Sequence, residues 1–242
     1  MLCLMAFASA AFAAPDPVAK EVSDALRQGV GKPGELSTAI RILILLTALS
    51  LIPAILIATT SFLRIVVVLS MLRHAMGMQD TPPNAALVSI ALFLTLFSMM
   101  PVWSQVDRQA WQPFQQKRLS AEAAFDEALK PVREFMIRQT REPDLALMVD
   151  LAGAKQPETT EDIGTLQLIP AFMLSELRTA FQIGFMIFLP FLLIDLIVAA
   201  VLTSLGMMMV PPVMISLPLK VLMFILIDGW NLVVRSLMSS FY

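Results

Sequence analysis

The sequence is poor in the side chains from which most catalytic and metal sites are built. It contains one histidine, one cysteine and one tyrosine. A metal site built from histidine and cysteine needs several such ligands, so this inventory argues against one. No acid is placed by sequence to orient His74, and no glycine-rich phosphate loop follows a strand. We therefore expect neither an enzyme nor a bound cofactor.

Charge is also scarce. Only 15% of the residues are charged, and the formal net charge of −2 offers no basic field for binding nucleic acid. What is abundant is apolar: 57% of the residues are hydrophobic and the mean hydropathy is +0.77. Soluble domains carry about 25% charged and 45–50% apolar residues. The composition predicts an all-α membrane protein.

The first residues have the pattern of a targeting segment. Leu2–Ala8 are apolar, and Ala11–Ala13 supply a small-residue cleavage pattern, although no basic residue precedes them. We expect a cleaved signal peptide over residues 1–13; the alternative is a disordered apolar tail. Cys3 lies within it, so the mature chain would hold no cysteine and form no disulfide.

Residues 14–40 would form a segment on the periplasmic side, followed by a first apolar helical hairpin over residues 41–106. Two uncharged runs, Ile42–Leu63 and Ala85–Val106, are each long enough to cross a hydrocarbon core of about 30 Å. Each is predicted to be a membrane helix.

Residues 107–165 differ in character, because acidic and basic residues are mixed along them. They are predicted to form a helical domain outside the membrane, in which Pro131 bends or ends one helix. The amphipathic pattern of that helix comes from apolar side chains at helical spacing, namely Phe125, Leu129, Val132 and Met136.

Residues 166–242 are predicted to form a second apolar hairpin. The run Leu166–Leu205 would be about 60 Å long as one helix, twice the thickness of a hydrocarbon core. It either breaks near Gly184 or Pro190 or extends well beyond the lipid. The last helix is expected over Val213–Met238. With a cleaved signal peptide, four crossings place the middle domain in the periplasm and both hairpin tips in the cytoplasm.

A weak internal repeat relates the two hairpins. A shift of 129 residues aligns Gly77-Met78 with Gly206-Met207, and Pro82-Pro83 with Pro211-Pro212. Glycine ends a helix readily and proline cannot continue one, so both motifs are typical of hairpin turns. The alternative is chance similarity between apolar segments.

Several charged side chains interrupt the apolar stretches. Such groups must pair, face water or lie inside the protein, because an isolated charge in lipid is costly. A proton relay is one interpretation, and structural ion pairs between helices or subunits are the other. Lys220 and Asp228 are eight residues apart, so they would share nearly the same helix face. The set consists of Glu176, Arg178, Asp195, Lys220 and Asp228.

Three consecutive methionines, Met207, Met208 and Met209, occupy the second hairpin tip. Thioether side chains form a flexible apolar surface. Around an axis they could close a wide passage to ions yet yield to an unfolded polypeptide. Burial of an ordinary turn against lipid or a neighbour is the alternative.

These motifs give the chain a family resemblance that covers nearly all of its apolar part. The motifs are Ser61-Phe62-Leu63-Arg64-Ile65, Leu72-Arg73, Pro82-Pro83-Asn84, Met100-Pro101-Val102, Phe172-Met173-Leu174-Ser175-Glu176-Leu177, Pro190-Phe191-Leu192-Leu193-Ile194-Asp195, Gly206 to Pro212, Leu217-Pro218-Leu219-Lys220 and Asp228-Gly229-Trp230. In these motifs the chain resembles the FliP family of flagellar export-gate proteins and, more distantly, their injectisome SctR counterparts.

The resemblance implies a homo-pentamer that joins FliQ and FliR, with FlhB and FlhA as further partners, at the flagellar basal body in the bacterial inner membrane. It also implies that Met207, Met208 and Met209 form the gasket of an export gate. Function is then expected to be a gated conduit for unfolded flagellar proteins. The alternatives are an ion-coupled transporter or proton channel using Glu176, Asp195 and Asp228, and a membrane scaffold without a pore.

Overall fold

The computed structural model describes residues 33–78, 80–153, 163–207 and 209–241. The expected signal peptide, most of the segment 14–40 and Met208 lie outside these residues. Within the described ranges the regular structure is entirely helical, which confirms the all-α prediction. The described residues fall into two compact units, of which the first ends at Ala54 and the second begins at Ile55.

Helix α3 (Pro33–Thr59) supplies the described part of the first unit and extends five residues into the second. Its stretch Ile40–Thr59 is long and apolar enough to cross a membrane, and none of its side chains is buried. The predicted helix Ile42–Leu63 is divided, because α3 ends at Thr59 and α4 (Phe62–Ala75) begins after a two-residue break. At that break the Thr60 hydroxyl donates to the Leu56 carbonyl over 2.6 Å.

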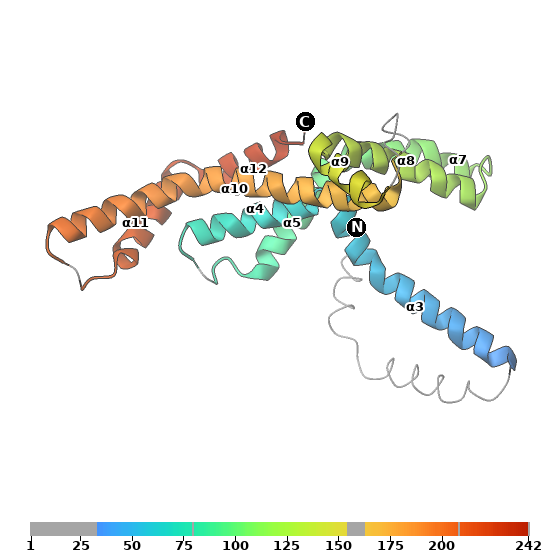
Figure 1. Ribbon diagram of the computed structural model, residues 1–242, viewed down its shortest axis with the longest axis horizontal. Helices are drawn as coiled ribbons and strands as arrows, with labels where there is room; N and C mark the ends of the chain where they lie inside the picture. The colour runs from blue at the N-terminus through green and yellow to red at the C-terminus, as the bar shows by residue number, and fades with distance from the viewer. Residues whose placement is uncertain (1–32, 79, 154–162, 208, 242) are drawn as a thin grey trace. The chain divides into compact units, whose positions relative to one another are not determined.

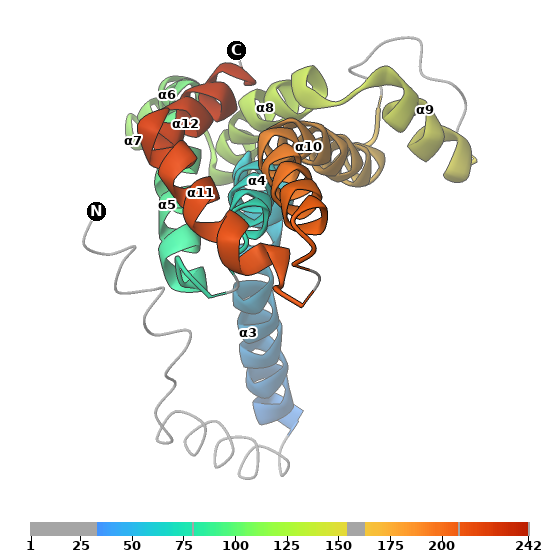
Figure 2. The ribbon, with the colours of Figure 1, turned by 90° about the vertical axis from the view of Figure 1, so that its left-hand side faces the viewer.

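Helix α10 (Thr165–Ser204) is the longest element of the second unit, with 40 residues and a length of about 60 Å. It runs unbroken through Gly184 and Pro190, so the helix does not break at either residue. Helix α4 packs along α10 and against α5 (Asn84–Ser98). Figure 2 shows α4 nearly end-on, with α10 on one side and α5 on the other.

The two returning segments are bent, so the predictions of single helices over Ala85–Val106 and Val213–Met238 are wrong. Helix α5 meets the segment Met100–Gln115 at 54°, and α11 (Pro212–Leu226) meets α12 (Gly229–Ser239) at 67°. The first bend precedes Pro101, which has no N–H to continue the helix. The second contains Asp228 in the left-handed conformation, with φ 51°. By length and composition, the described residues thus contain two helices that could cross a membrane, or four spans if each bent pair counts as one.

The middle of the chain is helical as predicted. The segment after the first bend comprises α6 (Met100–Val106), the π-helix η1 (Asp107–Trp111) and α7 (Gln112–Gln115), and it packs on α8 (Ala121–Gln139). Helix α9 (Glu142–Leu151) packs on α10.

Pro131, predicted to bend or end its helix, lies inside α8, which continues past it to Gln139, so the helix does not end there. Pro131, Phe135 and Met136 are buried, so α8 packs against its neighbours from the proline onward. Phe125 and Leu129 of the predicted apolar face are exposed, so the buried face begins only beyond them.

Several landmarks of the two hairpins recur at a spacing of 129 residues. The turn glycines Gly77 and Gly206 both have positive φ, 80° and 73°, which glycine adopts without steric cost. The helices that follow, α5 and α11, each have 15 residues. The next helices begin at Met100 and Gly229, again 129 positions apart. Duplication of one hairpin remains a prediction that these landmarks favour.

Candidate functional site

The second hairpin tip presents methionine side chains to its surroundings. After α10, the Gly206 and Met207 amides donate to the Thr203 and Leu202 carbonyls, which closes the helix end. Met209 is 98% exposed, and Met207 and Met214 are also exposed. A side chain added at Gly206 would meet nothing within 4 Å. The tip is therefore an unsupported apolar surface of soft side chains.

The first hairpin tip is held in place, in contrast to the second. Met76 is 4% exposed, and Met78 packs against the hydrophobic core. Arg73 Nη1 donates to Asn84 Oδ1 over 2.6 Å and to the Pro82 carbonyl over 3.3 Å. Among the described tip residues, Met207 and Met209 of the second tip are therefore exposed, whereas Met76 and Met78 of the first tip are packed.

The second tip also reaches further than the first. Arg64 of α4 pairs with Glu176 of α10, and Met71 lies against Gly184, so the two helices run parallel. Helix α4 ends at Ala75, whereas α10 continues about sixteen residues further, or about 24 Å. In Figure 1 the tip between α10 and α11 extends beyond the one between α4 and α5.

Arg64 and Glu176 form a buried ion pair at the base of both hairpins, with exposures of 2% and 0%. Arg64 Nε donates to Glu176 Oε2 over 3.0 Å, and its Nη2 to Glu176 Oε1. The guanidinium also donates to Gln139 Oε1 over 2.9 Å and to the Ser240 carbonyl and hydroxyl over 2.9 and 3.0 Å. It lies 4.1 Å from the centre of the Phe241 ring. One side chain thus joins the ends of α8 and α12 to α4 and α10.

Sequence reasoning identified Glu176 but used Arg64 only as part of the family motif. The available signal was an arginine within an apolar helix, which requires a partner. Gln139, as the partner from the middle domain, has no comparable signal in the sequence.

Asp195 and Lys220 form a second ion pair, between α10 and α11. Lys220 Nζ donates to Asp195 Oδ2 over 2.6 Å and to the Ala75 carbonyl over 3.2 Å. The lysine is 6% exposed, whereas the aspartate side chain is 43% exposed. The Ala75 carbonyl is among the last of α4, and such carbonyls have no partner within their own helix.

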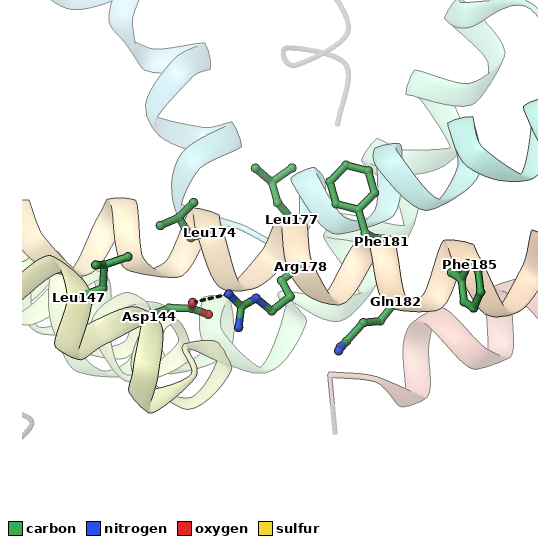
Figure 3. Close-up of a pocket in the computed structure, with 8 residues that line it drawn as sticks. All are labelled: Asp144, Leu147, Leu174, Leu177, Arg178, Phe181, Gln182 and Phe185. Atoms are coloured by element: carbon green, nitrogen blue, oxygen red, sulfur yellow. Dashed lines mark ion pairs between the residues drawn. The ribbon is translucent and has the colours of Figure 1, made fainter.

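Arg178 reaches Asp144 of α9, with 3.5 Å between Nη2 and Oδ1. Asp144 is buried, and its Oδ2 accepts a 2.8 Å hydrogen bond from the Ser175 hydroxyl, which itself accepts from the Arg141 amide. Arg178 and Asp144 border an open groove of about 650 Å³ along α10 (Figure 3). Its other lining residues are mostly apolar: Leu147, Leu174, Leu177, Phe181, Gln182 and Phe185.

Asp228 does not share a helix face with Lys220, contrary to the prediction, because the α11–α12 bend separates them. Its Oδ2 accepts from Asn231 Nδ2 over 3.0 Å. Within the described ranges it forms no ion pair. Of the five interrupting charges, the structure therefore brings four into ion pairs.

Among the residues placed in the structure, no three His, Cys, Asp or Glu side chains gather into a possible metal site. His74 Nδ1 lies 2.7 Å from the Ser70 carbonyl on its own helix.

Comparison with known proteins places the chain in a family. The model of the FliP family matches residues 45–237. Flagellar biosynthetic protein FliP of Bacillus subtilis is 50% identical over 209 residues, which cover 86% of this chain and 95% of the relative. The protein of that name from Pectobacterium carotovorum is 52% identical, covering 84% and 79%, and that from Aquifex aeolicus is 44% identical, covering 86% and 88%. The chain belongs to the FliP family.

Proposed function

We propose that this chain is the core pore subunit of the flagellar protein-export gate in the bacterial inner membrane. Copies of it surround an axis, and their second hairpin tips converge there. The exposed methionines around Met209 carry the proposal, because they lie at the free end of the longest apolar hairpin. The relatives' names supply the flagellar context.

The ring of thioethers acts as the gate. Apolar side chains disfavour a water column across a narrow passage, so ions are held back when the tips meet. Methionine adapts its shape because it is unbranched and polarisable, so an unfolded polypeptide can part the ring. Unfolded flagellar proteins are the cargo of the passage.

The assembly is a homo-pentamer that joins FliQ and FliR and contacts FlhB and FlhA. The exposed apolar faces of α3 and α10 supply surface for lipid and for these neighbours. The landmarks spaced by 129 residues arose by duplication of one hairpin.

The middle domain lies in the periplasm and both tips lie in the cytoplasm. This topology follows from cleavage of a signal peptide over residues 1–13. The hairpins rise partly out of the membrane plane, in keeping with a helix of about 60 Å.

The chain catalyses no reaction, and its charges serve packing. Glu176 and Asp195, two of the three acids on which a transporter mechanism would rest, each pair with a cation within the same chain. Of these three acids, Asp228 alone would then remain available for a transporter mechanism.

Replacing Met207, Met208 and Met209 together by alanine tests the gate. Purified complexes carrying the triple substitution should leak ions in liposomes while export is partly retained. Met186→Ala is the matched control, because Met186 is 70% exposed but lies on α10 away from the tip. Unchanged leak from fully assembled complexes would favour a scaffold. Intact complexes of Asp228→Asn with no flux would favour a transporter.

A further inference from the structure

The part of the second hairpin that extends beyond the first is weakly attached to the rest of the second unit. This overhanging hairpin comprises the described residues between Asp195 and Lys220. Gly206 has no neighbour at its open side, and only Val198, Leu202, Ser216 and Lys220 are buried within it. Most of its large apolar side chains are exposed, namely Leu196, Ile197, Val201, Leu205, Met207, Met209, Val213, Met214, Ile215 and Leu219.

Lys220 lies at the root of the overhanging hairpin and makes two contacts of different kinds. Its bond to Asp195 Oδ2, 2.6 Å long, joins α11 to α10 and so closes the hairpin on itself. Its bond to the Ala75 carbonyl, 3.2 Å long, joins the hairpin to the end of α4. Of these two bonds, only the second joins the overhanging hairpin to the first hairpin.

The Ala75 carbonyl is a suitable anchor for a lysine. It belongs to the last turn of α4, where carbonyls carry partial negative charge and favour a cation. The burial of Lys220 excludes most competing water. Nearby, a side chain added at Gly77 would lie 3.9 Å from Leu217 Cδ1, so the first tip also packs beside α11.

We infer that Lys220 is a positioning residue that sets the direction of the overhanging hairpin through the Ala75 carbonyl. The methionine tip is the part of the overhanging hairpin farthest from Lys220. A small rotation of the hairpin at Lys220 therefore displaces the tip more than any other part. The effect of a displaced tip on ion passage rests on the proposed gate. The effect of Lys220 on the direction of the hairpin does not.

Distances between spin labels in the full assembly test the geometric effect directly. Cys3→Ser removes the native thiol, and His74→Cys and Leu205→Cys place labels at exposed sites near the two tips. Labelled copies are diluted with unlabelled ones, so that pulsed electron paramagnetic resonance measures distances within one chain. With Lys220 present, we expect one narrow distance distribution.

Lys220→Met should abolish the narrow peak, because both contacts are lost. Asp195→Asn should retain it, since Lys220 still reaches the Ala75 carbonyl, and Lys220→Arg should restore it. The double variant Lys220→Met/Asp195→Asn leaves no unpaired charge, so it serves as the test if Lys220→Met alone fails to assemble. It should also lose the narrow peak.

A narrow peak in both variants that lack Lys220 would overturn the inference. Equal broadening in Asp195→Asn and Lys220→Met would also overturn it, because the ion pair rather than the carbonyl bond would then set the direction. Ion leak measured on the same complexes separates the two proposals. A broadened distribution without raised leak supports the role of Lys220 and contradicts the methionine gate.

Discussion

Met71 of α4 occupies the space that a side chain at Gly184 of α10 would fill. An added Cβ at Gly184 would collide with the Met71 thioether and lie 3.2 Å from Met71 Cβ. Glycine at this position therefore allows α4 and α10, which share the most extensive helix–helix packing of the second unit, to approach closely.

A larger residue at Gly184 should force α4 and α10 apart. We expect Gly184→Leu to lower the free energy of unfolding by about 1–3 kcal/mol, as overpacking does. Met71→Ala should relieve part of this loss, so the double variant should be more stable than the sum of the single effects predicts. Phe185→Leu, at an exposed neighbouring position, is the control. Strict additivity in a double-mutant cycle would show that the two sites do not touch.

Breaking the Arg64–Glu176 pair should destabilise the chain strongly. Arg64→Ala leaves a carboxylate buried without its cation, and removing one member of a buried pair costs about 3–5 kcal/mol. Glu127→Gln breaks the exposed pair with Lys130 instead, whose loss costs about 0–1 kcal/mol. Unfolding in detergent, measured for both variants, should separate them clearly. Similar midpoints for the two would contradict the role given to Arg64.

Attachment of α9 should depend on Ser175 more than on Arg178. Ser175→Ala leaves buried Asp144 Oδ2 and the Arg141 amide without a partner, each at a cost of about 1–3 kcal/mol. Arg178→Ala removes only a 3.5 Å contact of a side chain that is 52% exposed. Hydrogen exchange of the α9 amides should therefore accelerate in the serine variant and stay close to the original in the arginine variant. The reverse order would mean that the ion pair holds α9.

Composition and the spacing of apolar runs were sufficient to predict the helical class and the positions of both hairpin tips. A long uncharged run in lipid is almost always a helix, because its backbone groups must pair within the segment. Gly77 and Gly206 mark the turns because a turn there needs a positive φ, which glycine adopts readily. The bends at Met99 and Asp228 were not predicted. Runs of apolar residues look alike on either side of a bend, and Pro53, Pro170 and Pro190 lie inside helices that continue past them.

Pairing of the charges could be predicted only in part. The cost of an isolated charge indicates that Glu176 and Asp195 need partners, but which cation faces each depends on how α4, α10 and α11 pack. The contact of Lys220 with the Ala75 carbonyl has no sequence signal, because every helix ends in similar carbonyls.

Disulfide crosslinking at the second tip tests the central claim most directly. With Cys3 replaced by serine, Met209→Cys is the single thiol of each copy in assembled complexes. If the tips converge on an axis, mild oxidation should join neighbouring copies into covalent dimers. Leu166→Cys, 90% exposed near the opposite end of α10, should not form them. Intact complexes in which Met209→Cys stays monomeric but reacts with a lipid-soluble maleimide would contradict the account.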